Sequence, residues 1–433
     1  MSQTASVRSL DEISSCLSGY DPQALPVEQA RAFIDALVEP ITEQEKLPLR
    51  SALGRVLAED VVSTINVPSH DNSAMDGYAF RGAELNADGD TRFSVAGAGF
   101  AGDGVLSAIE AGQCVRIMTG AIMPADLDTV IPQEFVQLDG NQIVIPAGVV
   151  KAGDNRRLAG EDLARGEVAL HCGRRIRPAD LGLMASLGKA EVTVYRPLRV
   201  AFFSTGNELR SIGETLDDGC VFDSNRYTLW GMLSQLDVQL MDLGVVKDNR
   251  ASLTDAFERA AAQADVVITS GGVSVGEADY TKQIVAELGE VLFWRIAMRP
   301  GRPMAIGRLQ SRKNGNTALL FGLPGNPVAV MVTFYAFVRE ALMKKAGSVG
   351  ERLPLMRVKT TMPIRKRAGR TEFQRGTLAP DAAGEWAVSL TGAQGSGVLR
   401  SMSQANCLIV LGHEQQSVGA GEPVDVMLFD GLI

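Results

Sequence analysis

Hydrophobic residues in the second half of the chain follow two alternating patterns. Short apolar runs occur at 200–203, 238–245, 266–268, 291–294 and 318–321. Between them, apolar side chains recur at helical spacing, at 227–236, 253–260, 281–288 and from 328 to about 345. Strands that alternate with helices are typical of an open, mainly parallel α/β sheet, so we predict such a domain over residues 198–346.

The chain on either side of this domain has a different pattern. Apolar spacing over 27–41 predicts a helix that ends before Pro40, and further helices are predicted over 47–56 and 178–187. Residues 63–165 alternate short β-branched runs with Gly, Pro and Asp turns, which predicts a mostly β insertion domain. Residues 347–433 return to short β runs, which predicts a small C-terminal β domain of the barrel type.

The residues on either side of the predicted insertion domain form the remaining parts of the predicted domain organisation. The helices on either side of it, within residues 25–62 and 166–197, are expected to form a helical linker region. Residues 1–24 are expected to form a flexible tail. With 433 residues the chain is too long for one core, and a size of about 100–200 residues per domain agrees with a division into several domains.

Composition and charge narrow the functional classes. Lys and Arg number 42 against 51 Asp and Glu, the net charge is −9, and no basic stripe is present to follow a nucleic-acid backbone. The N-terminus lacks a cationic start followed by an apolar core, and no run reaches the ~20 apolar residues of a membrane span. The five scattered cysteines form no C-x-x-C pair, which favours a reducing compartment and argues against zinc. We therefore expect a cytoplasmic protein that binds neither nucleic acid nor a membrane.

A glycine-rich loop follows the apolar run 266–268. It contains Ser270, Gly271, Gly272, Ser274 and Gly276 and ends in acidic residues. Glycines let backbone N–H groups approach an anion closely, and the acids that follow could hold a cation against it. An ordinary strand-to-helix turn would also explain a lone Gly-Gly pair. The loop favours a phosphate site only because neighbouring strands end in equally unusual loops.

Three carboxylates each follow a different predicted strand. They are Glu208, Asp248 and Asp279. Ligands of an open α/β sheet bind beyond the carboxyl ends of its strands, so folding is expected to bring these side chains to one rim. Oxygen ligands without Cys or His suit Mg²⁺ together with substrate phosphates. Each acid alone is more often a solvated loop charge, but three on one rim favour a metal site.

Positive charge and a helix start lie at further strand ends. Arg295, Arg299 and Arg302 occupy a loop with two prolines, and guanidinium groups match phosphate or another oxyanion. A solubilising loop would have the same composition. Another anion-binding edge is expected where a helix begins after the residues Pro324, Gly325, Asn326 and Pro327, because helix N-termini present free N–H groups.

A second group of polar segments lies in the β insertion, at 71–78, 118–121, 156–157 and 160–162. Each segment alone could be a turn, since Asn, Asp, Ser and Gly are turn formers. Periodicity does not place this group near the first one. The three histidines show no ligand spacing, and the chain has no G-x-x-x-x-G-K.

Several motifs together resemble one family, the molybdopterin molybdenumtransferases, also called the MoeA family, which includes the E domain of gephyrin. The motifs are P-x-x-D-N-S-A-M-D-G-Y-A from Pro68, M-T-G-A from Met118, S-T-G-N-E-L from Ser204, S-G-G-V-S-V-G-E-A-D-Y from Ser270, R-P-G-R-P from Arg299 and G-L-P-G-N-P-V from Gly322. They occur in the family's order. The resemblance covers about residues 27 to 430.

The resemblance implies a four-domain elongated homodimer that dimerises through the linker region and has a molybdopterin-binding α/β domain. It implies a Mg²⁺-dependent transferase whose substrates are molybdate and adenylylated molybdopterin. Such an enzyme inserts molybdenum into the dithiolene and releases AMP. Molybdopterin adenylyltransferase and molybdoenzyme maturation proteins are then expected partners.

The resemblance also implies roles for individual residues. Glu208, Asp248 and Asp279 belong to the metal and nucleotide end of the cleft, and Asp76, Thr119 and Asp162 are similar to active-site residues that face it from the neighbouring subunit. Arg295 and Arg299 stand where many members have lysines, which keeps the charge and changes the geometry.

Two other functions fit parts of the sequence. Adenylyltransferases that charge molybdopterin with AMP share the α/β domain, but they typically have T-G-P after the paired glycines, where this chain has Val273-Ser274-Val275. A scaffold role, as in gephyrin, is weakened by the absence of a second fused catalytic domain or a long linker.

Overall fold

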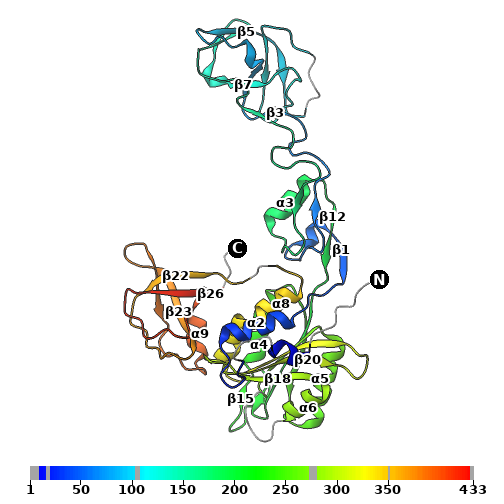
Figure 1. The fold of residues 1–433 in the computed structure, drawn as a ribbon, viewed down its shortest axis with the longest axis vertical. Coiled ribbons are helices and arrows are strands. Elements are labelled where there is room, and N and C mark those ends of the chain that lie inside the picture. Colours follow the sequence, from blue (N-terminus) through cyan, green and yellow to red (C-terminus); the bar gives the residue numbers. More distant parts are fainter. Residues whose placement is uncertain (1–8, 16–19, 103–107, 273–279, 350–351, 430–433) are drawn as a thin grey trace.

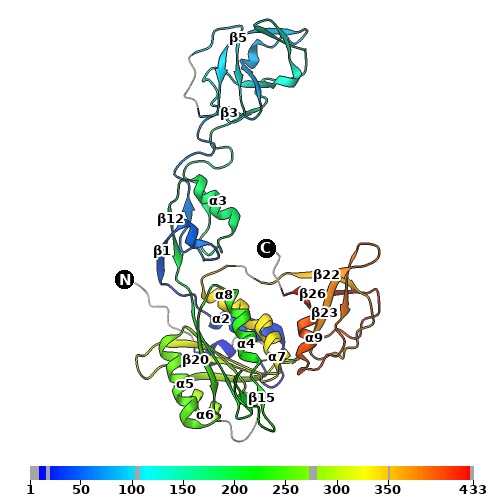
Figure 2. The ribbon, with the colours of Figure 1, turned by 180° about the vertical axis from the view of Figure 1, so that it is seen from behind.

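The protein is elongated in the computed structural model, which describes residues 9–15, 20–102, 108–272, 280–349 and 352–429. The insertion domain lies at one end, a small linker lies in the middle, and the α/β and C-terminal domains lie side by side at the other end (Figure 1; Figure 2 from behind). Across these described ranges, no helix is long and apolar enough to cross a membrane.

The α/β domain is built on one six-stranded sheet. Its strands lie in the order β16 (Gln239–Val246), β13 (Arg199–Thr205), β17 (Val266–Ser270), β21 (Thr317–Leu323), β20 (Pro303–Gln310) and β18 (Gly289–Arg295). The first four are mutually parallel, whereas β20 is antiparallel to both of its neighbours. The prediction of a mainly parallel sheet is confirmed, although β20 itself was not predicted.

Helices cover both faces of this sheet. Those on one face are α4 (Asn225–Ser234) and a long helix formed by α7 (Pro327–Thr333), the π-helical turn η4 (Phe334–Val338) and α8 (Arg339–Lys345). Those on the other face are α5 (Arg250–Gln263) and α6 (Tyr280–Leu288). Phe202 and Phe203 of β13 enter opposite cores, because successive side chains of a strand point to opposite faces.

The N-terminal segments pack on the α/β domain. The helix α2 (Val27–Leu37) ends before Pro40, as predicted, and places Phe33 edge-on against Trp294, with ring centroids 5.0 Å apart. A short helix, α1 (Leu10–Ser15), buries Leu10 and Ile13 in the same core. The prediction of a flexible tail over 1–24 is therefore wrong for this helix, because its apolar side chains have a core to enter.

The insertion domain carries a six-stranded sheet, as the alternating pattern predicted. Its order is β7 (Thr129–Pro132), β4 (Gly77–Phe80), β6 (Gln113–Ile117), β5 (Thr91–Gly99), β9 (Gln142–Ile145) and β8 (Gln137–Asp139). Gly77 sits where β4 meets β7, and a Cβ there would lie 1.9 Å from the carbonyl oxygen of Ile131. The short helices η2 (Gly82–Glu84) and η3 (Gln133–Phe135) complete the domain.

The linker is mostly β, contrary to the helical region that we predicted. Strand β1 (Gln44–Pro48) pairs with β12 (Glu191–Tyr195), and the 3-10 turn η1 (Leu49–Ala52) follows β1. The predicted helix over 47–56 is therefore wrong, because pairing with a distant strand overrides the local spacing. The predicted helix near 178 is present as α3 (Pro178–Ser186). Two-stranded pairs, β2 (Val61–Val62) with β11 (Val168–Leu170) and β3 (Asn72–Ser73) with β10 (Arg156–Arg157), lead to the insertion domain.

The C-terminal domain is a closed β-barrel. Its strands are β22 (Leu355–Thr360), β23 (Thr371–Pro380), β24 (Trp386–Leu390), β25 (Cys407–Leu411) and β26 (Pro423–Leu428), with the helix α9 (Leu399–Gln404) before β25. The pairing of β23 with β25 closes the sheet. The two-residue strand β19 (Met298–Arg299), from the α/β domain, pairs with β23 and joins the two domains.

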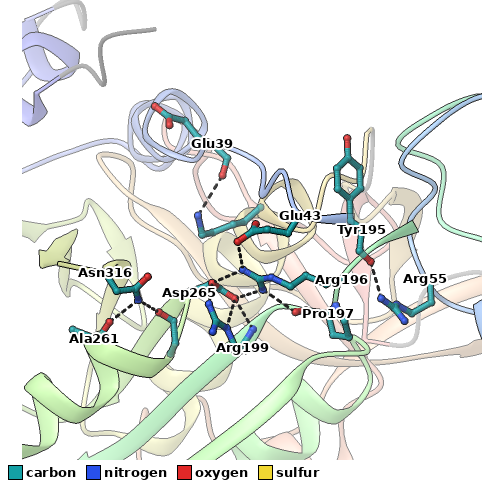
Figure 3. Close-up of polar contacts among 12 residues, drawn as sticks. Glu39, Glu43, Arg55, Tyr195, Arg196, Pro197, Arg199, Ala261, Asp265 and Asn316 are labelled. Carbon is teal, nitrogen blue, oxygen red and sulfur yellow. Dashed lines mark hydrogen bonds and ion pairs between the residues drawn. The ribbon is translucent and has the colours of Figure 1, made fainter. Parts of the chain in front are cut away.

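A buried carboxylate joins the linker to the α/β domain (Figure 3). Asp265, which precedes β17, accepts hydrogen bonds from Arg196 at 2.7 and 2.9 Å and from Arg199 at 2.9 Å. Arg196 also donates to Glu43 at 3.2 Å. Burial would raise the pKa of Asp265, but hydrogen bonds from the two arginines outweigh it and hold the pKa well below its ordinary range. Asp265 thus fixes the point where both connecting segments leave the α/β domain.

Candidate functional site

A cleft of about 1250 Å³ opens at the carboxyl ends of β13, β17 and β21. The barrel forms its other wall through Arg370, Gln394, Gly395 and Ser396. The chain leaves β13 toward β16 on one side and then reaches β17 on the other, so the cleft lies at a topological switch point. Ligands of open α/β sheets bind at such points.

The glycine loop after β17 is shaped by close contacts that only glycine permits. Gly271 has φ +90°, and a Cβ there would lie 2.5 Å from the carbonyl oxygen of Thr205. Gly272 has φ +67°, and a Cβ there would lie 2.6 Å from Oγ1 of Thr281. The two residues line the cleft together with Ser270. Their backbone is therefore exposed to a ligand, as a phosphate-binding loop requires.

A buried asparagine links the two loops that lie beside this turn. The side-chain N–H groups of Asn225 donate to Ser270 Oγ and to the carbonyl oxygen of Gly325, both at 2.7 Å. Its neighbour Asp223 accepts a hydrogen bond of 3.0 Å from Ser204. The four predicted residues from Pro324 to Pro327 also line the cleft and lead into α7. Side-chain hydrogen bonds thus hold the loops of the cleft floor together.

Several buried oxygens of this floor have no hydrogen-bond partner within the described part of the chain. They are Oγ1 of Thr205, Oδ2 of Asp223 and Oδ1 of Asn225. Buried polar atoms in native proteins are almost always hydrogen-bonded. The floor is therefore suited to a polar ligand and not to an apolar one.

Two of the three predicted carboxylates line one side of the cleft. Glu208 follows β13 and Asp248 follows β16, and both side chains are exposed. Neither forms an ion pair with any described residue. Asp279, Ser274 and Gly276 lie outside the described residues. Among the residues that the structure describes, no group of three His, Cys, Asp or Glu side chains could hold a metal ion.

Arginines line the opposite side of the cleft. Arg299 and Arg302 are exposed, and neither forms an ion pair within the described ranges. Arg370 joins them from the barrel and is held by Glu372 at 2.8 Å. Arg295 differs from the prediction, because it lies at the end of β18 and is not among the residues that line the cleft.

The remaining predicted residues lie in the insertion domain. Thr119 donates from its backbone N and from Oγ1 to Asp76 Oδ1, at 2.8 and 2.7 Å. The backbone bond and then the hydroxyl bond hold the pKa of Asp76 below its ordinary value. Asp162 is exposed in the same domain, where its backbone N donates to Val67. Within one chain this domain lies far from the cleft (Figure 1).

Several residues of the cleft were missed by sequence reasoning. Asp223 and Asn225 are not among the predicted site residues, and the barrel residues Arg370, Gln394 and Ser396 give no local signal. The one signal in the sequence for this part of the cleft is the run of three polar residues at 223–225. The barrel residues reach the cleft only through tertiary structure.

Family models match most of the chain. Residues 25–188 match the MoeA N-terminal region (domain I and II), residues 201–344 match a probable molybdopterin binding domain, and residues 357–429 match the MoeA C-terminal region (domain IV). The α/β domain corresponds to the second of these matched regions, and the barrel corresponds to the third.

Whole proteins and solved structures agree with these models. The molybdopterin molybdenumtransferase of Haemophilus influenzae is 43% identical over 411 residues, covering 94% of this chain and all of that protein. Gephyrin of Dictyostelium discoideum is 32% identical, covering 93% of this chain and 62% of gephyrin. The molybdopterin biosynthesis moeA protein of Pyrococcus horikoshii superposes with a TM-score of 0.79 at 27% identity, covering 94% of this chain and 100% of that one. The chain therefore belongs to the molybdopterin molybdenumtransferase family.

Proposed function

We propose that this protein inserts molybdenum from molybdate into adenylylated molybdopterin and releases AMP. The observation that carries the proposal is the cleft itself. Glu208 and Asp248 on one side and Arg299 and Arg302 on the other form no ion pair with any residue that the structure describes, and glycine-shaped backbone lies between them. A substrate that carries phosphates and reacts with an oxyanion needs all three. Family membership supports the same reaction.

Each side of the cleft has a distinct task in this proposal. The backbone N–H group of Gly272 binds a phosphate of the substrate, whereas that of Gly271 donates to the carbonyl oxygen of Leu323 at 3.1 Å. Asn225 keeps the loops at a fixed separation. Arg299 and Arg302 bind molybdate or a substrate phosphate, since guanidinium groups match tetrahedral oxyanions. These contacts orient both reactants in one place, which supplies much of the rate enhancement.

The carboxylates fit a magnesium ion by chemistry. Glu208 and Asp248 offer oxygen donors without competing basic partners among the described residues, and Mg²⁺ takes one or two carboxylates together with substrate phosphates. When bound, the ion would neutralise charge at the phosphates as AMP leaves. Asp279, predicted as a third ligand, stays a prediction.

We infer that a homodimer completes the site. Asp76, Thr119 and Asp162 are exposed in a domain that lies far from the cleft of the same chain, so they can serve this reaction only at the cleft of a second copy. Monomers should therefore be inactive. A cytoplasmic location, and contact with molybdopterin adenylyltransferase or with molybdoenzyme maturation proteins, also stay predictions.

The test is a reconstituted reaction. Purified protein is incubated with adenylylated molybdopterin, molybdate and Mg²⁺, and both AMP and active cofactor are measured. The proposal expects AMP release that depends on molybdate. A parallel incubation with molybdopterin and ATP tests adenylyltransferase activity. Pyrophosphate formation there, with no molybdate-dependent AMP in the first reaction, would assign the protein to the adenylyltransferases.

A further inference from the structure

A fully buried arginine stands behind the basic side of the cleft. Arg375, in β23, is 0% exposed. Its guanidinium donates to Oγ of Ser401 at 3.0 Å and to the carbonyl oxygens of Gln394, Ala393 and Gly395 at 3.2, 2.9 and 3.0 Å. These four hydrogen bonds engage most of the five N–H donors of this cation, but they do not neutralise its charge.

The charge of Arg375 has no carboxylate partner among the described residues. Arg55, the other arginine of the described chain that is at least nine-tenths buried, forms ion pairs with both Glu45 and Asp237. Burial, and then the nearby charge of Arg299, lower the pKa of Arg375. Burying an unpaired charge is costly, and a neutral apolar side chain would fill the space without that cost. The cost is explained if the charge acts on something else.

The loop that surrounds Arg375 forms a wall of the cleft. The side chain of Gln394 forms two hydrogen bonds with the backbone of Arg375. Its Oε1 accepts from Arg375 N at 2.8 Å, and its Nε2 donates to Arg375 O at 3.1 Å. Gln394, Gly395 and Ser396 all line the cleft. The carbonyl oxygen of Ser396 accepts from Val328 N at 3.2 Å, which ties the loop to the first turn of α7. Arg375 thus sets the position of a wall that contacts the start of that helix.

We propose that Arg375 is a positioning residue for oxyanion binding, whose hydrogen bonds hold the 393–396 loop in place and whose unneutralised charge attracts the anion held by Arg299 and Arg302. The inference rests on the proposed function, since it takes the cleft to bind molybdate. Buried charges are screened less than exposed ones. The contribution of Arg375 should therefore persist at ionic strengths that weaken the contribution of Arg302.

Molybdate binding, measured by equilibrium dialysis without the second substrate, separates the two parts of this role. Arg375→Gln removes the charge and should raise the molybdate Kd about tenfold. Arg375→Lys keeps the charge and should restore most of the lost affinity. Arg357→Gln is the control, because it removes an exposed charge of the same domain that pairs with Asp425 away from the cleft, and it should bind as the wild type does.

A pH titration of Arg375→Lys provides a second test within one folded variant. A buried lysine loses its proton at a lower pH than an exposed one, whereas arginine stays charged. As the pH rises from about 7 to about 10, molybdate affinity of the lysine variant should fall relative to that of the wild type at the same pH. This comparison applies even if the glutamine variant does not fold. The neighbouring charged residues Arg299, Arg370 and Glu372 are present in both proteins, so their titration changes both molybdate affinities alike and does not alter the ratio of the two affinities.

The outcomes are distinct from those that test the proposed function. Equal Kd values for the wild type, Arg375→Gln and Arg375→Lys at every pH would overturn the inference, as would absence of molybdate binding to the wild type. Equal weakening in both variants, without pH dependence, would leave only a structural role and would also overturn it. If the wild type binds molybdate with the expected differences and yet releases no AMP, the inference stands and the proposed function fails.

Discussion

The cleft of the α/β domain and the Asp76–Thr119 pair of the insertion domain are both polar, but they are built differently. The cleft encloses about 1250 Å³, and its lining includes Glu208, Asp248, Arg299 and Arg302, none of which forms an ion pair with another described residue. The Asp76–Thr119 pair is exposed, and its two hydrogen bonds keep the carboxylate ionised. A cleft with unpaired charges is ready for a ligand, whereas an exposed, pre-organised pair with a stable charge is suited to complete a surface elsewhere.

The largest loss of activity should follow from removing an acid of the cleft. Glu208→Ala or Asp248→Ala should reduce AMP release about a hundredfold or more, because each removes a carboxylate that, in the proposed reaction, would hold Mg²⁺ at the leaving phosphate. Neither side chain is packed in a core, so circular dichroism should not change. The control is Asp139→Ala in the insertion domain, which removes an exposed acid that pairs with Arg92. Full activity of both cleft variants at saturating substrate would remove these acids from the site.

A smaller effect is expected on the basic side of the cleft. Arg299→Ala should raise the molybdate concentration for half-maximal rate about tenfold to a hundredfold, since a hydrogen bond to a charged group contributes ~1.5–3 kcal/mol. Arg299→Lys should raise it far less, because lysine keeps the charge. Arg295→Ala should have little effect, since Arg295 does not line the cleft. Unshifted molybdate curves for both Arg299 variants would make the loop an ordinary solvated turn.

Activity should fall less when a substitution in the insertion domain removes only one of the hydrogen bonds to the Asp76 carboxylate. Thr119→Val deletes the hydroxyl bond to Asp76 and keeps the backbone bond, so AMP release should fall only a fewfold. The pKa of Asp76 should rise toward its ordinary value, and NMR titration of the carboxyl carbon measures it. The depressed pKa makes the ionised pair stabilising above pH about 4, and this contribution is lost as the pH falls through the folded value. An unchanged Asp76 titration in the variant would contradict the assigned hydrogen bond.

A substitution at the junction between the linker and the α/β domain should lower the stability of the protein and leave its reaction chemistry unchanged. Asp265→Asn leaves Arg196 and Arg199 without their shared partner and should lower the free energy of unfolding by about 3 kcal/mol near neutral pH. Because the pKa of Asp265 is depressed, its contribution is complete above pH about 4 and disappears as the pH falls below that range. Denaturant unfolding at several pH values measures both. Asp425→Asn, at an exposed pair, is the control and should cost less than ~1 kcal/mol. Equal losses in the two variants would show that Asp265 is not an anchor.

The sequence predicts the central part of the α/β sheet well because the strands there are buried on both faces. The apolar runs of β13, β17 and β21 are visible without any tertiary information. Strand β20 was missed, because Gly307 interrupts its apolar run. The structure explains this glycine, since a Cβ there would lie 2.0 Å from the carbonyl oxygen of Glu290. A glycine that is required by close approach between strands looks, in the sequence, like a glycine of a turn.

The cleft was predictable only where a strand end supplies a residue. Glu208 and Asp248 were found because each directly follows a strand. Arg370 and Gln394 come from a separate domain, and the loop that holds Gln394 is positioned by the buried Arg375, so nothing in their local sequence marks them. Arg295 was assigned to the cleft because it is near Arg299 in sequence, although the strand end that carries it is tied to the N-terminal segment at Pro22 and Leu25.

Mixed dimers test most directly whether the two regions form one site. A chain with Asp76→Ala and a chain with Glu208→Ala are co-expressed with different tags, and the purified heterodimer is assayed for molybdate-dependent AMP release beside each variant homodimer. The account predicts inactive homodimers and a heterodimer with about half of the wild-type rate, because one cleft receives both substitutions and the other receives none. A heterodimer as inactive as its parents would contradict the shared cleft.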